Sequence, residues 1–143
     1  MSSMAKRPDN LGVRDGKLAA CPDTPNCVST QAGDTLHAIE PFRFAGSPAH
    51  AMQQLRTLVE AQPRATIVTA ANDYLHVAFR SLVFRFVDDV EFFVDADERV
   101  VHFRSASRVG HSDLGANRRR MESLRTKFEQ QPAESAAKGP VAR

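Results

Sequence analysis

A net charge of one sign and long apolar runs are both missing from this sequence. The 143 residues include 19 Lys and Arg and 17 Asp and Glu, which gives a formal net charge of +2. Such a chain has no overall basic field to hold a nucleic-acid backbone, so we expect no nucleic-acid partner and only local basic patches. No apolar stretch with the length of a signal peptide or membrane anchor opens the chain. As written, the sequence predicts a cytoplasmic protein without a membrane span, or an exported one if a native leader has been lost.

The signatures of metal sites and of common enzymes are missing too. A zinc site needs about four ligands, and no second pair of Cys or His accompanies Cys21 and Cys27 at a standard spacing. The sequence contains no Gly-x-Ser-x-Gly elbow, no Walker glycine loop and no His-Glu-x-x-His helix. We therefore predict no metal site, no cofactor and no catalytic residue. The two cysteines have five residues between them, and they either form a disulfide or remain buried thiols.

The composition is that of one folded domain. Hydrophobic residues make up 42% and charged residues 25% of the chain, and a chain of this length can bury a single core. Residues 1–34 are rich in turn formers and predict an irregular N-terminal arm. Residues 35–131 predict a single α+β domain, and residues 132–143 lack bulky apolar side chains and predict a disordered tail.

Hydrophobic periodicity places the elements of this domain. Ser47 and Pro48 predict the start of a helix that Pro63 ends. A last helix is expected from Ser112 or Asp113, either of which can cap it. Together with the strands, these helices predict an α+β fold, in which an antiparallel meander of about four or five strands packs against two main helices. The alternation of apolar and polar residues predicts strands within residues 37–44, 66–69, 74–81, 82–95 and 99–108.

The most unusual stretch, residues 104–120, joins the last strand to the last helix. It holds five arginines, three serines, two glycines, an aspartate and an asparagine. Glycines permit close backbone approach and a helix start presents free N–H groups, so the stretch is suited to holding an anion. That anion is either a ligand or the carboxylates of the protein's own acidic run at residues 88–91.

The favoured function is the non-catalytic binding of a small anionic or amphipathic ligand between the polar face of the sheet, the arm and this stretch. In the purely structural alternative, the same arginines lock strand to helix through the acidic run. A small enzyme that uses His102 with Asp89 or Glu91 is another alternative, and so is an interaction module with a filled interior and an exposed apolar patch. The candidate ligand-binding residues are Arg80, Asp89, Glu91, Arg104, Ser105, Ser107, Arg108, Asp113, Asn117 and Arg118.

Four motifs carry a resemblance to a known family. They are Asn10–Val13, Cys21–Ser29, Phe86–Phe92, and the Arg-Ser-Ala-Ser-Arg motif that opens at Arg104 and extends through Asn117-Arg118. Through these motifs, the chain resembles the bacterial and plant family catalogued as domain of unknown function 1499, from about Leu11 to Phe128. The family is named for having no established function, so the resemblance implies no activity. It does imply that some similar proteins carry leaders or anchors.

Overall fold

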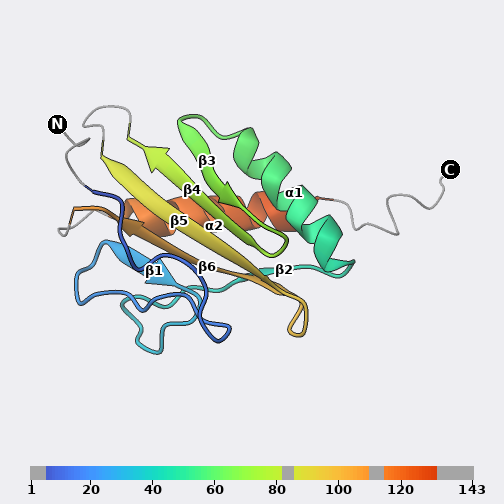
Figure 1. The fold of residues 1–143 in the computed structure, drawn as a ribbon, viewed down its shortest axis with the longest axis horizontal. Coiled ribbons are helices and arrows are strands. Elements are labelled where there is room, and N and C mark those ends of the chain that lie inside the picture. Colours follow the sequence, from blue (N-terminus) through green and yellow to red (C-terminus); the bar gives the residue numbers. More distant parts are fainter. Residues whose placement is uncertain (1–5, 82–85, 110–114, 132–143) are drawn as a thin grey trace, which may run out of the picture.

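The fold consists of one antiparallel sheet and two helices (Figure 1). The computed structural model describes residues 6–81, 86–109 and 115–131, so the tail predicted at residues 132–143 lies outside the described part. Among the described residues, no helix combines the length and the apolar character needed to cross a membrane. The elements in chain order are β1 (Cys27–Ser29), β2 (Phe42–Arg43), α1 (Pro48–Glu60), β3 (Ala65–Ala70), β4 (Tyr74–Arg80), β5 (Val87–Asp95), β6 (Val100–Ser107) and α2 (Ala116–Glu129).

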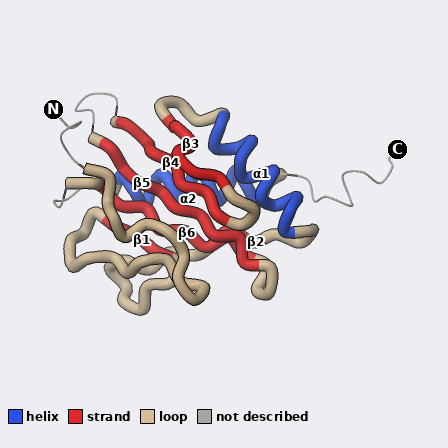
Figure 2. Tube along the Cα trace, viewed as in Figure 1, coloured by secondary structure: helices blue, strands red, loops and turns tan. Residues whose placement is uncertain are grey.

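The sheet has six strands, with the order β1-β6-β5-β4-β3 and with β2 also paired to β6. All pairings are antiparallel, and β3 to β6 follow one another as a meander. This confirms the predicted α+β class and the predicted meander. The two strands outside this meander, β1 and β2, are short and both pair with β6. The loop-rich N-terminal third lies around β1 and β6 (Figure 2).

Helix α1 forms as its capping residues predict. The Ser47 side chain accepts a hydrogen bond from the backbone N–H of His50 at 3.1 Å, and Pro48 occupies the first helical position. Proline suits that position because its missing N–H would have had no partner there. The helix ends at Glu60, before Pro63 can interrupt its hydrogen bonds.

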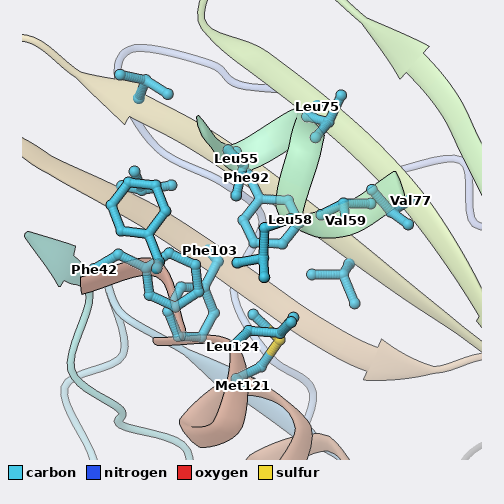
Figure 3. Packing of buried hydrophobic residues seen from close by; sticks show 14 of the residues in the cluster. Phe42, Leu55, Leu58, Val59, Leu75, Val77, Phe92, Phe103, Met121 and Leu124 are labelled. Atoms are coloured by element: carbon cyan, nitrogen blue, oxygen red, sulfur yellow. The ribbon is translucent and has the colours of Figure 1, made fainter. Parts of the chain in front are cut away.

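Both helices cover one face of the sheet, and the hydrophobic core lies between them and the strands (Figure 3). Phe92 of β5 is paired in register with Phe103 of β6, and the Phe42 ring lies 5.1 Å from that of Phe103. Burying each such side chain contributes about 1.5–3 kcal/mol to folding. The largest fully buried apolar side chains are Phe42, Leu55, Val59, Leu75, Val77, Phe92, Phe103, Met121, Leu124 and Phe128.

The opposite face of the sheet is covered by the N-terminal arm rather than by a helix. In Figure 1, α2 runs behind the strands while the arm crosses in front of β6. The backbone N–H of Gly12 donates to the Glu91 side chain of β5, and Leu18 is buried. The arm is not irregular throughout, because Cys27–Ser29 forms β1 and pairs with β6.

Two element boundaries differ from the sequence prediction. The strand expected within residues 37–44 is reduced to β2, Phe42–Arg43, next to Pro41, which has no N–H to donate to a ladder. Helix α2 begins at Ala116, and its N-cap is Gly115, with a φ of 81° and no capping side chain. The expected caps at residues 112 and 113 lie outside the described part.

Candidate functional site

The candidate residues of β6 do not form one site, because successive residues of a strand point to opposite faces of the sheet. Ser105 faces the helices, where its hydroxyl donates to the side-chain oxygen of Asn117 in α2. Arg104 faces the arm, where its Nη2 donates to the carbonyl oxygen of Ala20. We name the two groups the helix-side cluster, Asp88, Ser105, Ser107, Asn117 and Arg120, and the arm-side cluster, Tyr74, His76, Asp89, Glu91, Arg104 and Arg108.

The helix-side cluster is centred on Asn117, whose side chain joins three segments of the chain. Its oxygen accepts the hydrogen bond from Ser105, and its Nδ2 donates to Ser107 Oγ at 3.1 Å and to the carbonyl oxygen of Asn26 at 3.2 Å. Asn117 is 1% exposed. Buried amides of this kind need their partners, so the cluster ties β1 and β6 to α2.

The arginines of α2 are used within the fold. Arg120 Nη2 forms an ion pair with Asp88 at 2.8 Å, and its guanidinium lies 4.7 Å from the centre of the Phe79 ring. Arg118 donates to the carbonyl oxygens of Ala38 at 2.8 Å and Leu36 at 3.0 Å. The pair between Arg120 and Asp88 is of the kind expected if the arginines lock helix to strand through the acidic run. Arg118 instead joins the helix to backbone carbonyls of the N-terminal segment.

Asp89 is the most heavily bonded carboxylate of the arm-side cluster. Its Oδ2 accepts from Arg108 Nε at 2.7 Å, and its Oδ1 accepts from Arg108 Nη2 at 3.0 Å and from His76 Nε2 at 2.7 Å. Burial acts to raise the pKa of Asp89. The hydrogen bonds from His76 and Arg108 outweigh burial and hold that pKa below its usual value. The carboxylate is thus fixed as an anion.

Glu91 is fully buried and only half bonded. Its Oε2 accepts from the Gly12 N–H at 2.6 Å and from the Tyr74 hydroxyl at 2.5 Å. Among the described residues, its Oε1 has no hydrogen-bond partner. Burial raises the pKa of Tyr74, and the hydrogen bond to Glu91 and the charge of Glu91 raise it further. Tyr74 therefore stays protonated and acts as a donor.

Arg104 lies opposite Glu91 in the register of β5 and β6, yet the two side chains form no ion pair. Its guanidinium is buried, and the Nη2 contact to Ala20 is long at 3.4 Å, beyond the usual range of about 2.7–3.2 Å. Its Nε has no hydrogen-bond partner in the part of the chain that the structure describes. Burial lowers the pKa of Arg104, while the charges of Glu91 and Asp89 act to raise it. Within residues 6–81, 86–109 and 115–131, Arg104 is the candidate arginine that is buried without a bonded carboxylate.

The remaining predicted residues are placed elsewhere. Arg80 is exposed at the end of β4, and Asp113 lies outside the described residues. His102 contacts Glu98 at 3.0 Å and Asp95 at 3.8 Å. In the described part of the chain it forms no ion pair with Asp89 or Glu91, so the catalytic pairing proposed for His102 is not assembled.

Within the arm, a disulfide between Cys21 and Cys27 joins the segment before β1 to β1 itself, with the two Cα atoms 5.8 Å apart. Beside it, a cavity of about 260 Å³ lies between residues 17–21 and residues 29–34. Two of its lining residues are neighbours of Arg104, since Ala20 accepts its hydrogen bond and Ser29 is its register partner in β1. Arg104 itself does not line the cavity, so Ala20 and Ser29 lie between the cavity and the buried guanidinium.

Sequence reasoning missed a group of ligand-type side chains at the turn between β5 and β6. Asp95, Glu98 and His102 each offer one atom, and these atoms all lie within 4.8 Å of one another. The pattern Asp-x-x-Glu-x-x-x-His could have pointed to them, because a hairpin folds such residues together. To recognise this group from the pattern, one must also know that the turn lies between Asp95 and His102.

Comparison with known proteins adds one finding. A family described as protein of unknown function (DUF1499) matches residues 17–128. No curated protein and no solved structure matches the chain. Because the match spans most of the sequence and includes both clusters and the disulfide, this chain belongs to the DUF1499 family.

Proposed function

We propose that the protein binds, without catalysis, a small carboxylate ligand that also carries a hydrogen-bond donor, held by Arg104 beneath the N-terminal arm. The observation that carries the proposal is the state of Arg104, a buried guanidinium with an unbonded Nε and one long hydrogen bond. Arginine has five N–H donors in a planar fork that fits a carboxylate. Burying a charged group whose N–H donors lack acceptors costs free energy. A bound carboxylate would supply the missing acceptors.

The neighbouring Glu91 selects which carboxylates fit. The charge of Asp89 is balanced by Arg108, whereas Glu91 has no ion pair with a cation among the described residues and keeps a free Oε1. A simple anion at Arg104 would be repelled by that charge. A hydroxyl or ammonium group on the ligand would instead donate to Oε1, so we infer a hydroxy acid or an amino acid.

The cavity beside the arm suits a ligand of this size. Its volume of about 260 Å³ is just below the range of drug-sized sites, which starts at about 300 Å³, and leaves room only for a small ligand. The lining carries one charge of each sign, Lys17 and Asp34, and Leu18 and Ala19 supply apolar surface for a short carbon chain. A ligand carboxylate that enters here would replace the weak contact between Arg104 and Ala20.

Titration of the full chain with lactate and with acetate tests the proposal, with binding followed by NMR chemical shifts. We expect lactate to bind more tightly than acetate, and Arg104→Gln to weaken lactate binding by about tenfold or more, the effect of losing a charged hydrogen bond of about 1.5–3 kcal/mol. The matched control is Arg43→Gln, because Arg43 is exposed on β2 and its side chain forms an ion pair with the exposed Glu40. It should bind lactate as the wild type does.

A second variant separates binding from misfolding. Glu91→Gln removes the repelling charge, so acetate should bind this variant more tightly than it binds the wild type. A gain of binding does not arise from damage to the fold. The proposal is wrong if neither probe binds the wild type, or if Arg104→Gln binds lactate as well as Arg43→Gln does.

A further inference from the structure

A second group of polar side chains lies two residues along β6 from Arg104, where β5 turns into β6. The His102 Nε2 atom is 3.0 Å from Glu98 Oε1 and 3.8 Å from Asp95 Oδ2. The three side chains share a cleft of about 320 Å³ with Thr30 and Lys17. This group is separate from the contacts of Arg104 described above.

The side chains are oriented by contacts outside the group. Asp95 Oδ1 accepts from the backbone N–H groups of Asp97 at 3.0 Å and Glu98 at 3.1 Å, which directs Oδ2 toward His102. The other ring nitrogen of His102, Nδ1, lies 2.9 Å from Thr30 Oγ1. A second hydrogen bond of this kind is what fixes the ring of a metal-binding histidine.

We propose that Asp95, Glu98 and His102 form a binding site for a first-row divalent cation such as Zn²⁺. One imidazole with two carboxylates is a donor set for Zn²⁺ or its neighbours, whereas Mg²⁺ and Ca²⁺ prefer oxygen ligands alone. Three protein ligands leave a fourth position open to water in the cleft.

The separations between the donor atoms can be compared with those around a bound zinc ion. Zinc bonds of about 2.0–2.2 Å in a tetrahedron place ligand atoms about 3.4 Å apart. The two separations from His102 Nε2, 3.0 and 3.8 Å, lie on either side of this value. The atoms of Asp95 and Glu98 lie within 4.8 Å of each other, so the two carboxylates can need to approach each other by up to about 1.4 Å. Glu98 can move toward a metal at little cost, because its side chain is 64% exposed.

The local charge also favours a cation. Asp95 and Glu98 bring two negative charges, with a third at Asp97 in the same turn. Arg99 is directed away, since its guanidinium donates to the carbonyl oxygen of Gly46. Lys17 lines the cleft, and no ion pair joins it to the carboxylates in the part of the chain that the structure describes. A bound metal ion would therefore neutralise the negative charge of these carboxylates.

Calorimetric titration of the full chain with ZnCl₂ tests the site. We expect one Zn²⁺ per chain and no heat from MgCl₂ at the same concentrations. Glu98→Gln and His102→Gln should each weaken Zn²⁺ binding by about tenfold or more, since even the outer-shell partners of metal ligands are worth that much. Asp97→Asn is the matched control, because it removes the same charge from the same turn without removing a ligand.

The outcomes are distinct. If Glu98→Gln and Asp97→Asn weaken binding equally, the turn attracts cations only by its charge and the proposal is wrong. It is also wrong if His102→Gln binds Zn²⁺ as the wild type does, or if no Zn²⁺ binds. Because Arg104 is not a ligand, Arg104→Gln should keep the Zn²⁺ affinity, which separates this site from the proposed carboxylate site.

Discussion

At the scale of single residues, Asp89 holds together the charged part of the arm-side cluster. It is 1% exposed and receives three charged or polar hydrogen bonds from Arg108 and His76. Asp89→Asn leaves the guanidinium of Arg108 without its ion pair, so we expect a loss of about 3–5 kcal/mol in the free energy of unfolding. Urea unfolding at neutral pH measures this loss. Asp97→Asn, at an exposed turn, should change stability by no more than about 0.5 kcal/mol.

The same residue gives stability a defined dependence on pH. The pKa of Asp89 is lower in the folded chain than its usual value, which is about 3.9 in an unfolded chain. The stabilisation is therefore fully present above about pH 4 and is lost as the pH falls through the folded pKa. Wild-type stability should decline in this acidic window, and Asp89→Asn should show a shallower decline. Equal slopes for the two proteins would mean that other carboxylates govern acid unfolding.

At the scale of elements, the disulfide holds the part of the arm before β1 against β1. Cys21 and Cys27 are six positions apart, and closing so short a loop stabilises a fold by about 2 kcal/mol in the chain-entropy account. Reduction should lower the melting temperature of the wild type, whereas the double variant Cys21→Ser and Cys27→Ser should melt at the lower temperature with or without reductant. A wild type that melts at the same temperature after reduction would show that other contacts hold the arm.

Local signals predicted the longer elements. Ser47, Pro48 and Pro63 mark the ends of α1, and alternation marks β3 to β6, because these patterns depend only on neighbouring residues. The three-residue strand β1 was missed because Cys27 pairs with Ala106, far away in the sequence, and a segment rich in turn formers gives no periodicity.

The candidate site was predicted only in part, because the sequence does not show which charged residues meet across the strands. Clusters of arginine and acid indicated that ion pairs would form, and Arg108 with Asp89 is one of them. Which arginine would be left over depends on how far each side chain reaches across the register. Arg104 and Glu91 face each other in neighbouring strands without bonding, and no property of either residue alone shows this.

At the scale of the whole molecule, the sheet is enclosed by two different covers. The helices bury the apolar face, and the arm closes a face that holds three buried charged groups, Asp89, Glu91 and Arg104. Charged groups under an apolar helix would lack donors and acceptors, whereas an extended arm supplies them from its backbone, as the Gly12 N–H and the Ala20 carbonyl do. The irregular arm is thus the part of the fold that makes a polar face compatible with burial.

Tyr74 can report on this cover, because the chain has one tyrosine and no tryptophan. Removing residues 1–16 takes away Gly12 and exposes the hydroxyl. Burial is the main reason that the pKa of Tyr74 is raised, so the truncation should lower that pKa toward its usual value of about 10. The Glu91 charge remains and keeps it above that value, and the lost Gly12 N–H acts in the opposite direction with a smaller effect.

A titration of the tyrosinate absorbance in the near ultraviolet measures this change, with circular dichroism recorded in parallel to show that the strands persist. Removing residues 1–5 alone is the control, since Gly12 then keeps its bond to Glu91. The full chain and the control should ionise together, at higher pH than the chain truncated at residue 16. Identical curves for all three would mean that the strands alone shield Tyr74, and the arm would then be a surface attachment rather than the second cover of the sheet.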